Sequence, residues 1–259
     1  MTLALPHFAP LDYLLLIMVS VMSTLIAYLH HPKWKALILA LPIPFTLVVL
    51  AVGRPIDASN IVGLNLLLAY THGVRFFYQK LRLPIVLAIL LSATGYVLLG
   101  KWLVSRVPHT PEMFWAALVG TMLLALLLQW LLPERDEPGH RSQLAIAIKF
   151  PLVVLIVCFV VVIKNELQGF TSMFPMVGLI AAYESRHSLW TVCRQIQMAM
   201  LSLGLMIVTI YLLQGPLGIG WALAAGWVVM LSVLLPLTRD IWRAPEVARE
   251  PAPLGASSS

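Results

Sequence analysis

Long apolar runs, separated by short polar segments, make up most of the chain. The runs are long and unbroken, unlike the short alternating strands of a membrane barrel, and they have the length of helices that cross a bilayer. They predict nine helices, at 11–30, 35–53, 59–74, 83–100, 112–132, 144–163, 169–184, 192–214 and 217–237.

Composition places these helices in a membrane. Hydrophobic residues make up 60% of the chain and charged residues 11%, whereas charged residues are about 25% of an ordinary globular domain. A soluble fold could not bury so much apolar surface, so we predict an all-α, polytopic transmembrane bundle whose main partner is the lipid bilayer. The net charge of +6 is scattered between apolar runs, which argues against a nucleic-acid partner. Cys158 and Cys193 lack the spacing of metal ligands and are expected to pack as small apolar residues.

The first apolar run, Leu11 to Leu29, is expected to be a retained span. No basic residue precedes it, and His30-His31-Pro32-Lys33 follows it in place of a small-residue cleavage site.

Basic residues predict the orientation of the spans, because they concentrate in cytoplasmic loops. With the N-terminus outside and the C-terminus cytoplasmic, 13 of the 17 basic residues fall inside. The four outside are Arg54, Lys101, Arg106 and Lys164.

The chain divides into two similar halves. In each half a long apolar run with a proline leads to a polar knot holding one basic and one acidic residue, then to a short apolar segment that ends in Ala-Tyr, with His and Arg close behind. We predict an extra helix in 1–32, a four-helix repeat in 33–132, a polar linker at 133–143, a second repeat in 144–238 and a disordered cytoplasmic tail at 239–259. Four helices are an even number, so the repeats should be parallel, related by an axis along the membrane normal.

The second half also resembles a known family. Ile148-Lys149, Lys164-Asn165, Gly169, Phe174-Pro175 and Leu179 to Tyr183 are similar to the pattern of the GlpM-like family of small, four-helix bacterial inner-membrane proteins. The first half departs from this pattern, with Arg54-Pro55 in place of Lys-Asn and no Phe-Pro. The resemblance implies a bacterial inner-membrane location and a pseudo-dimer within one chain, but it implies no activity.

The short helices mark the candidate site. The segments 59–74 and 169–184 have about 15 apolar residues, or about 22 Å, against a hydrocarbon core of about 30 Å. Paired short or Gly/Pro-interrupted segments at matching places in two halves point to the binding region of a transporter. Pro175 lacks a backbone donor and can open its helix. The candidate solute-binding residues are Arg54, Asp57, Asn60, Asn65, Lys164, Asn165, Glu166, Gln168 and Pro175.

The same residues also have structural interpretations. The charged knots can be solvated loops whose opposite charges pair for little energy. Asn65, one amide among leucines, should face protein and can bond a neighbouring helix in place of a solute. His72 and His187 are candidates for a proton relay because histidine titrates near neutral pH, while the nearby Tyr70 and Tyr183 are typical of interface anchors.

Motifs for other chemistry are absent. The sequence has no nucleotide-binding glycine loop, no Gly-x-Ser-x-Gly elbow, no His-Glu-x-x-His and no CxxC, so no cofactor or metal is expected. The leading hypothesis is a gradient-driven permease or channel-like transporter for a small solute, which is not an enzyme. The alternative is a non-catalytic membrane subunit that scaffolds a partner complex. The protein partners considered are a second copy of the chain, in a homo-oligomer, or another member of a membrane complex. A lipid-modifying enzyme comes third, because only His72, His187 and Glu184 offer it an interfacial cluster.

Overall fold

The structure, a computed structural model, describes residues 10–29, 32–133, 137, 151, 154–156, 158–159 and 167–243. These residues are almost entirely helical and contain no strand, as the apolar pattern predicts. Their eight α-helices are α1 (Pro10–Tyr28), α2 (Pro32–Ala40), α3 (Ile43–Val52), α4 (Ala58–Arg75), α5 (Ile85–Val104), α6 (Pro111–Leu131), α8 (Met176–Glu184) and α9 (Leu189–Arg243). A π-helical turn, η1 (Phe76–Lys80), continues α4, and a 3₁₀ helix, η2 (Gln168–Met173), precedes α8.

Three helices of this described part are long and apolar enough to cross a membrane, by length and composition: Ile85–Val104, Pro111–Leu131 and Leu189–Pro236. Large apolar side chains are exposed along all three, among them Leu98 at 63%, Leu123 at 62% and Val228 at 69%. Soluble proteins rarely expose so much contiguous apolar surface. The apolar helices therefore indicate a membrane protein.

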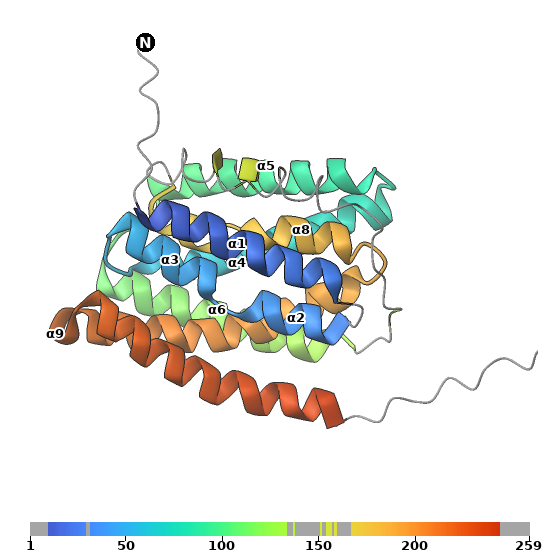
Figure 1. The fold of residues 1–259 in the computed structure, drawn as a ribbon. Coiled ribbons are helices and arrows are strands. Elements are labelled where there is room, and N and C mark those ends of the chain that lie inside the picture. Colours follow the sequence, from blue (N-terminus) through green and yellow to red (C-terminus); the bar gives the residue numbers. More distant parts are fainter. Residues whose placement is uncertain are drawn as a thin grey trace, which may run out of the picture.

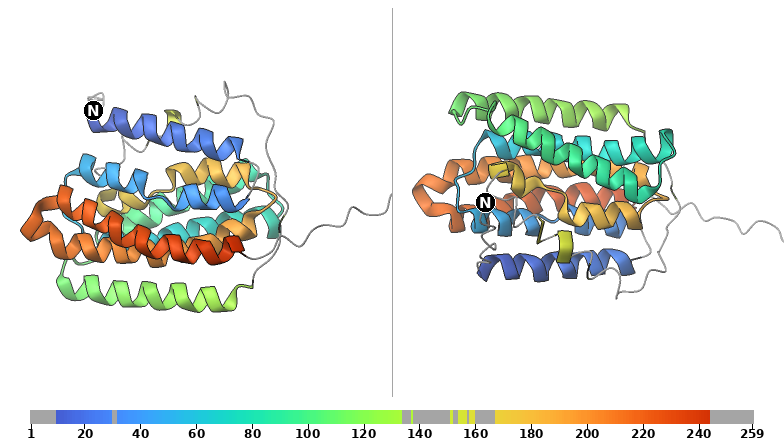
Figure 2. Two further views of the ribbon diagram at one scale, coloured as in Figure 1. Left: turned by 60° about the horizontal axis from the view of Figure 1, so that its bottom comes forward. Right: turned by 90° about the horizontal axis from the view of Figure 1, so that it is seen from above.

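The helices lie side by side along one common direction, with α4 in the interior (Figure 1). Helix α4 packs against α5, α6, η2 and α9, while α1 covers α3 and α8. Helices α1 and α6 lie on opposite sides of the bundle (Figure 2). The start of α1 and the end of α9 lie at opposite ends of the bundle (Figures 1 and 2). Below, the two ends are named by the end of α4 that lies there, N-terminal or C-terminal.

Proline interrupts two of the expected helices, and a glycine bends α9. The predicted helix 35–53 is split into α2 and α3 at Leu41-Pro42, because proline disfavours helical geometry in the residue before it. The predicted helix 169–184 is split at Phe174, which is extended (φ −61°, ψ 131°), just before Pro175. Gly218, at φ 75° and ψ 162°, bends α9 into two arms that fold back on each other (Figure 1). Residues with a Cβ rarely adopt that backbone conformation.

These interruptions explain where the helices differ from the sequence-based prediction. Nine helices in two parallel repeats were expected, but the described residues form eight α-helices. The predicted 35–53 becomes two helices, the predicted 192–214 and 217–237 become the two arms of α9, and the predicted 144–163 contributes no α-helix to this count. The predicted helix 144–163 lies mostly outside the described residues. The helix predicted at 59–74 extends beyond the apolar stretch in the structure. The observed α4 has 18 residues, and the π-helical turn η1 continues it by 5. Polar residues such as His72 remain helical because a helix end can carry polar side chains.

Aromatic contacts join α9 to the first half of the chain. Phe114 on α6 stacks on Tyr211 with ring centroids 3.7 Å apart and planes at 10°. The indole N–H of Trp227 donates to Thr46 Oγ1 at 2.9 Å, so the second arm of α9 is held to α3. Both arms of α9 are therefore fixed against helices that precede residue 132.

Candidate functional site

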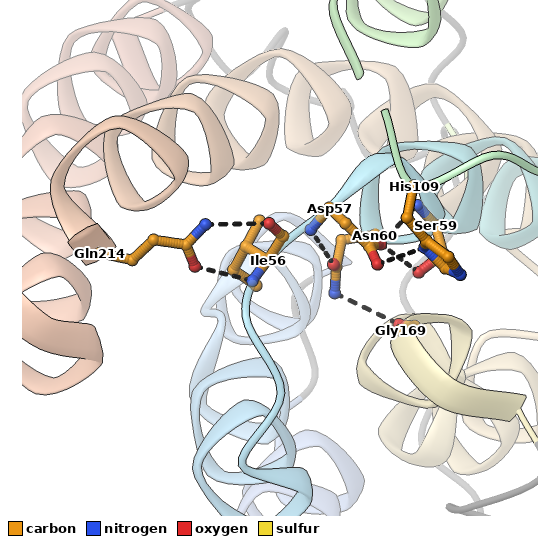
Figure 3. A network of polar contacts seen from close by, with 7 residues as sticks. All are labelled: Ile56, Asp57, Ser59, Asn60, His109, Gly169 and Gln214. Atoms are coloured by element: carbon orange, nitrogen blue, oxygen red, sulfur yellow. Dashed lines mark hydrogen bonds and ion pairs between the residues drawn. The ribbon is translucent and has the colours of Figure 1, made fainter. Parts of the chain in front are cut away.

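Seven residues from four segments meet at the α4 N-terminal end of the bundle (Figure 3). This group, which we name the polar cluster, comprises Ile56, Asp57, Ser59, Asn60, His109, Gly169 and Gln214. It joins the α3–α4 loop and α4 to the α5–α6 loop, to η2 and to the bend of α9.

Asp57 begins α4. It is the N-cap residue, and its Oδ1 accepts hydrogen bonds from the Ser59 N–H at 2.8 Å and from the Ser59 hydroxyl at 2.5 Å. Its other oxygen lies 2.7 Å from Nδ1 of His109 in the α5–α6 loop. A carboxylate at a helix N-terminus satisfies free backbone N–H groups and is favoured by the helix dipole. Asp57 therefore fixes the start of α4 and ties it to His109.

Asn60 connects α4 to η2. Its side chain is buried, its Oδ1 accepts from the Asp57 N–H at 3.0 Å, and its Nδ2 donates to the Gly169 carbonyl at 3.3 Å and to Ser172 Oγ at 2.9 Å. The backbone approaches closely here, because a Cβ at Gly169 would collide with Ser59 Oγ. Glycine at 169 is thus what lets η2 reach the first turn of α4.

Gln214 pairs with the backbone of Ile56. Its Oε1 accepts from the Ile56 N–H at 2.7 Å and its Nε2 donates to the Ile56 carbonyl at 3.0 Å. Figure 3 shows Gln214 reaching from α9 toward the loop that leads into α4. One side chain thereby satisfies both backbone groups of a buried loop residue, which an apolar environment requires.

The polar cluster links α4 and the loop before it to the α5–α6 loop, to η2 and to α9. The side chains of Asp57, Asn60 and Gln214 form hydrogen bonds with other parts of the protein. At the buried Asn60, removing one partner leaves another group unsatisfied, at a cost greater than the bond itself contributes. The arrangement is therefore suited to holding segments in place.

A separate cavity of about 100 Å³ lies where the interrupted helices meet. Residues from α2 and α3 (Leu39 and Pro44), from the η2–α8 break (Ser172 to Gly178), from α4 and from α9 line it. None of its described lining residues carries a charge. Pro175, a predicted site residue, is part of this lining and is buried.

Three hydroxyl-bearing residues line the cavity. The Thr71 hydroxyl donates to the Leu67 carbonyl at 2.8 Å, and the Ser172 hydroxyl donates to the Gly169 carbonyl at 2.6 Å. The Tyr70 side chain is 4% exposed, and its hydroxyl has no hydrogen-bond partner among the described residues. A buried hydroxyl without a partner costs free energy, so Tyr70 is an unfavourable feature of the packing beside the cavity.

The α4 C-terminal end carries the predicted proton-relay residues. His72 is half-buried with Nε2 at 3.4 Å from Gln197 Nε2 on α9, and His187 is exposed in the turn between α8 and α9. At the same end, the Glu137 carboxylate accepts from the Trp190 and Thr191 N–H groups at 3.2 and 2.7 Å and so caps α9. The Arg75 guanidinium lies over the Trp190 ring, 4.2 Å from its centroid. These contacts fix the start of α9, and a proton relay stays a prediction.

The other predicted site residues separate into groups. Arg54 is exposed, while Asp57 and Asn60 belong to the polar cluster. Asn65 donates to Thr121 Oγ1 on α6 at 2.8 Å, so it bonds a neighbouring helix, and it does not line the cavity. Lys164, Asn165 and Glu166 lie outside the described residues, and Gln168 begins η2. Solute binding by any of these residues stays a prediction.

Sequence reasoning missed three residues that matter for this geometry. Tyr70 was expected at the membrane interface, yet it is buried against the cavity. His109 and Gln214 stood in or beside predicted turns, where polar residues are ordinary. Only Gln214 offered a signal, as an amide at the end of a long apolar run, and its partner Ile56 lies 158 positions away.

No protein family, curated protein or solved structure matches the chain. The resemblance of the second half to the GlpM-like family therefore stays a prediction.

Proposed function

We propose that this protein is a membrane permease or channel-like transporter for a small solute, and that the cavity between the interrupted helices holds the solute. The observation that carries this proposal is the position of the cavity, because its lining includes the break before Pro175 and residues on both sides of the break between α2 and α3 (Leu39 and Pro44). In secondary transporters, discontinuous helices form the binding site near the bilayer midplane.

The lining supports solute binding in two ways. It combines an apolar wall with a small number of hydroxyl groups, as small-molecule sites usually do. It also includes residues from α4, from α8 and from α9, so a relative shift of these helices would change the cavity and its access. The polar cluster would then act as a fixed joint beside the moving parts, and not as the solute site.

The proposed architecture has nine crossings in two parallel repeats after an extra first helix. The segments α2–α3, α4, α5 and α6 would correspond to 144–163, η2–α8 and the two arms of α9. In this proposal each repeat resembles a GlpM-like four-helix unit, and the pair forms a pseudo-dimer in a bacterial inner membrane. The N-terminus would lie outside, and a reporter fused after Arg243 would be cytoplasmic. Absence of a nucleotide motif from the sequence favours transport driven by gradients.

The test is uptake by proteoliposomes that contain the purified protein, measured by light scattering for uncharged solutes and by current for ions. Ala199 is 4% exposed and lines the cavity, so Ala199→Leu would fill much of it. Ala69 is exposed on α4 and Ala69→Leu is the matched control. We expect uptake to be lost in Ala199→Leu and kept in Ala69→Leu. Equal uptake by both variants would overturn the proposed site, and uptake of no solute by the parent protein, together with a stoichiometric co-purifying partner, would favour a scaffold.

A further inference from the structure

We propose that the connection between α4 and α5 binds the phosphate group of an anionic phospholipid, and that Lys80 and Arg82 hold this phosphate. The connection, which we name the basic turn, comprises η1 and residues 81–84 at the α4 C-terminal end of the bundle. None of its residues lines the cavity, so the inference is independent of transport. Three observations carry it: the backbone of Arg82, the lack of acidic partners and the level of the turn relative to the apolar face of α5.

Arg82 has a backbone conformation that rarely suits a residue with a side chain. Its φ is 55°, and no other non-glycine residue in the described part of the chain has a positive φ. Arg82 follows a helical segment directly, and the turn closes where the Leu83 N–H donates to the Phe77 carbonyl at 3.1 Å. Glycine is the usual residue at such a place, because a Cβ costs free energy there. An arginine in a position that favours glycine points to a role for its side chain.

The side chains of Lys80 and Arg82 are exposed and unpaired. Neither forms an ion pair or a hydrogen bond with a residue that the structure describes. The sequence has no acidic residue between Asp57 and Glu112, so the basic turn contains no carboxylate of its own. Lys80 and Arg82 therefore form a positive surface patch that fits an anion.

Two other charged side chains near this end are engaged within the protein. The Arg75 guanidinium donates to Gln79 at 3.1 Å and lies over the Trp190 ring. The Glu137 carboxylate accepts from backbone N–H groups at the start of α9. These contacts leave the charges of the basic turn for a ligand from outside the chain.

The basic turn lies at the level of lipid headgroups. The first turns of α5 present apolar side chains to lipid, with Val86 55% and Leu90 56% exposed. Arg82 precedes Val86 by four residues, or about 6–13 Å at about 1.5–3.3 Å per residue. The headgroup layer is about 5–8 Å thick on each side of the hydrocarbon core, and long basic side chains extend toward it. Phe76 and Leu81, each 52% exposed, supply the apolar contacts of a segment at this boundary.

A phospholipid with a net negative charge is the anion that fits this position. Arginine binds phosphate through parallel N–H···O bonds, and lysine binds it as a point charge. A zwitterionic lipid would bring its own cation close to two unpaired positive charges, so an anionic lipid is favoured. Each basic residue near a membrane surface raises the affinity for anionic lipid about fivefold. In the proposed topology this end faces the cytoplasm, where anionic lipids concentrate in eukaryotic membranes and are abundant in bacterial ones.

Quenching of a local fluorophore by brominated lipid measures binding at this one place. In a background with Cys158 and Cys193 replaced by alanine, Leu81→Cys is labelled with bimane on the full-length protein. The labelled protein is placed in phosphatidylcholine bilayers that contain increasing shares of brominated phosphatidylglycerol. Brominated phosphatidylcholine gives the reference for contact without selectivity.

Four substitutions in the labelled protein separate charge from structure. Arg82→Gln and Lys80→Gln each remove one charge from the basic turn. Arg106→Gln is the matched control, because Arg106 is exposed just beyond the opposite end of α5. Arg82→Gly removes the side chain together with the unfavourable backbone conformation, so this variant should fold at least as well as the parent.

We expect the labelled parent to prefer phosphatidylglycerol over phosphatidylcholine about 25-fold, and Arg82→Gln and Lys80→Gln each to lower this preference about fivefold. Arg82→Gly should lose the same fivefold while its unfolding midpoint in dodecyl sulfate stays at or above that of the parent. Arg106→Gln should keep the parental preference.

Three results would overturn the inference. The first is a parental preference in Arg82→Gln and Arg82→Gly, or an equal loss in Arg106→Gln. The second is a preference that falls in Arg82→Gly only together with the unfolding midpoint, which would give Arg82 a structural role. The third is displacement of phosphatidylglycerol by inorganic phosphate but not by chloride at the same ionic strength, which would make the ligand a soluble anion.

Discussion

The polar cluster makes a quantitative prediction about two asparagines on the same helix. Asn60 is buried and makes three hydrogen bonds, at 3.0, 3.3 and 2.9 Å, two of which cross to η2. Asn65 is half-buried and makes one, to Thr121 at 2.8 Å, and its Oδ1 already lacks a partner among the described residues. Replacing either asparagine by alanine removes the same side-chain amide, but Asn60→Ala loses three hydrogen bonds and Asn65→Ala loses one.

The two variants should lose different amounts of unfolding free energy, and the difference exceeds the error of a stability measurement. At about 1 kcal/mol per neutral hydrogen bond, with the long contact to Gly169 counted at less, Asn60→Ala should lower the free energy of unfolding by about 2–3 kcal/mol. Asn65→Ala should lower it by about 0.5–1 kcal/mol, the usual size of one hydrogen bond between membrane helices.

The assay is reversible unfolding in mixed micelles by increasing dodecyl sulfate, followed by tryptophan fluorescence. A double-mutant cycle of Asn60→Ala with Ser172→Ala isolates the cross-segment bond, and we expect a coupling of about 0.5–1 kcal/mol. Equal destabilisation by the two asparagine variants, or zero coupling in the cycle, would show that α4 and η2 are not held together as described.

Three further predictions concern neighbouring contacts. Gly169→Ala should destabilise the protein because its Cβ would collide with Ser59 Oγ; Ser59→Ala should recover part of that stability, and no recovery in the double variant would contradict the close approach. Gln214→Leu should speed hydrogen exchange at the Ile56 amide, which loses its acceptor, and unchanged protection measured by mass spectrometry would argue against the pairing. Glu137→Gln should cost about 0.5–2 kcal/mol of stability because the cap of α9 loses its charge and one acceptor; an unchanged unfolding midpoint would mean that another group caps α9.

The apolar pattern predicted the helices well because it depends on residues near one another in sequence. Proline and glycine also act locally, and the break at Pro175 falls where the sequence predicts one. The break between α2 and α3 was not predicted, although Pro42 and Pro44 lie in the middle of the predicted helix 35–53. Transmembrane helices tolerate interior proline, so proline alone does not predict a break.

The site was harder to predict because its contacts are not local. Asn60 and Ser172 are 112 positions apart, and Gln214 pairs with a backbone that carries no side-chain signal. The burial of Tyr70 follows from the packing of α8 and α9 around α4. A tyrosine at the end of an apolar run has the same sequence signature at an interface as in a core.

The account depends most on solutes reaching the cavity from water. Val177 is 4% exposed and lines the cavity, whereas Leu90 on α5 is 56% exposed on an apolar face. In a background with Cys158 and Cys193 replaced by alanine, single cysteines at 177 and 90 are treated with methyl methanethiolsulfonate in liposomes. The account predicts faster modification at 177 than at 90. A cysteine at 177 that reacts no faster than the one at 90 would contradict it.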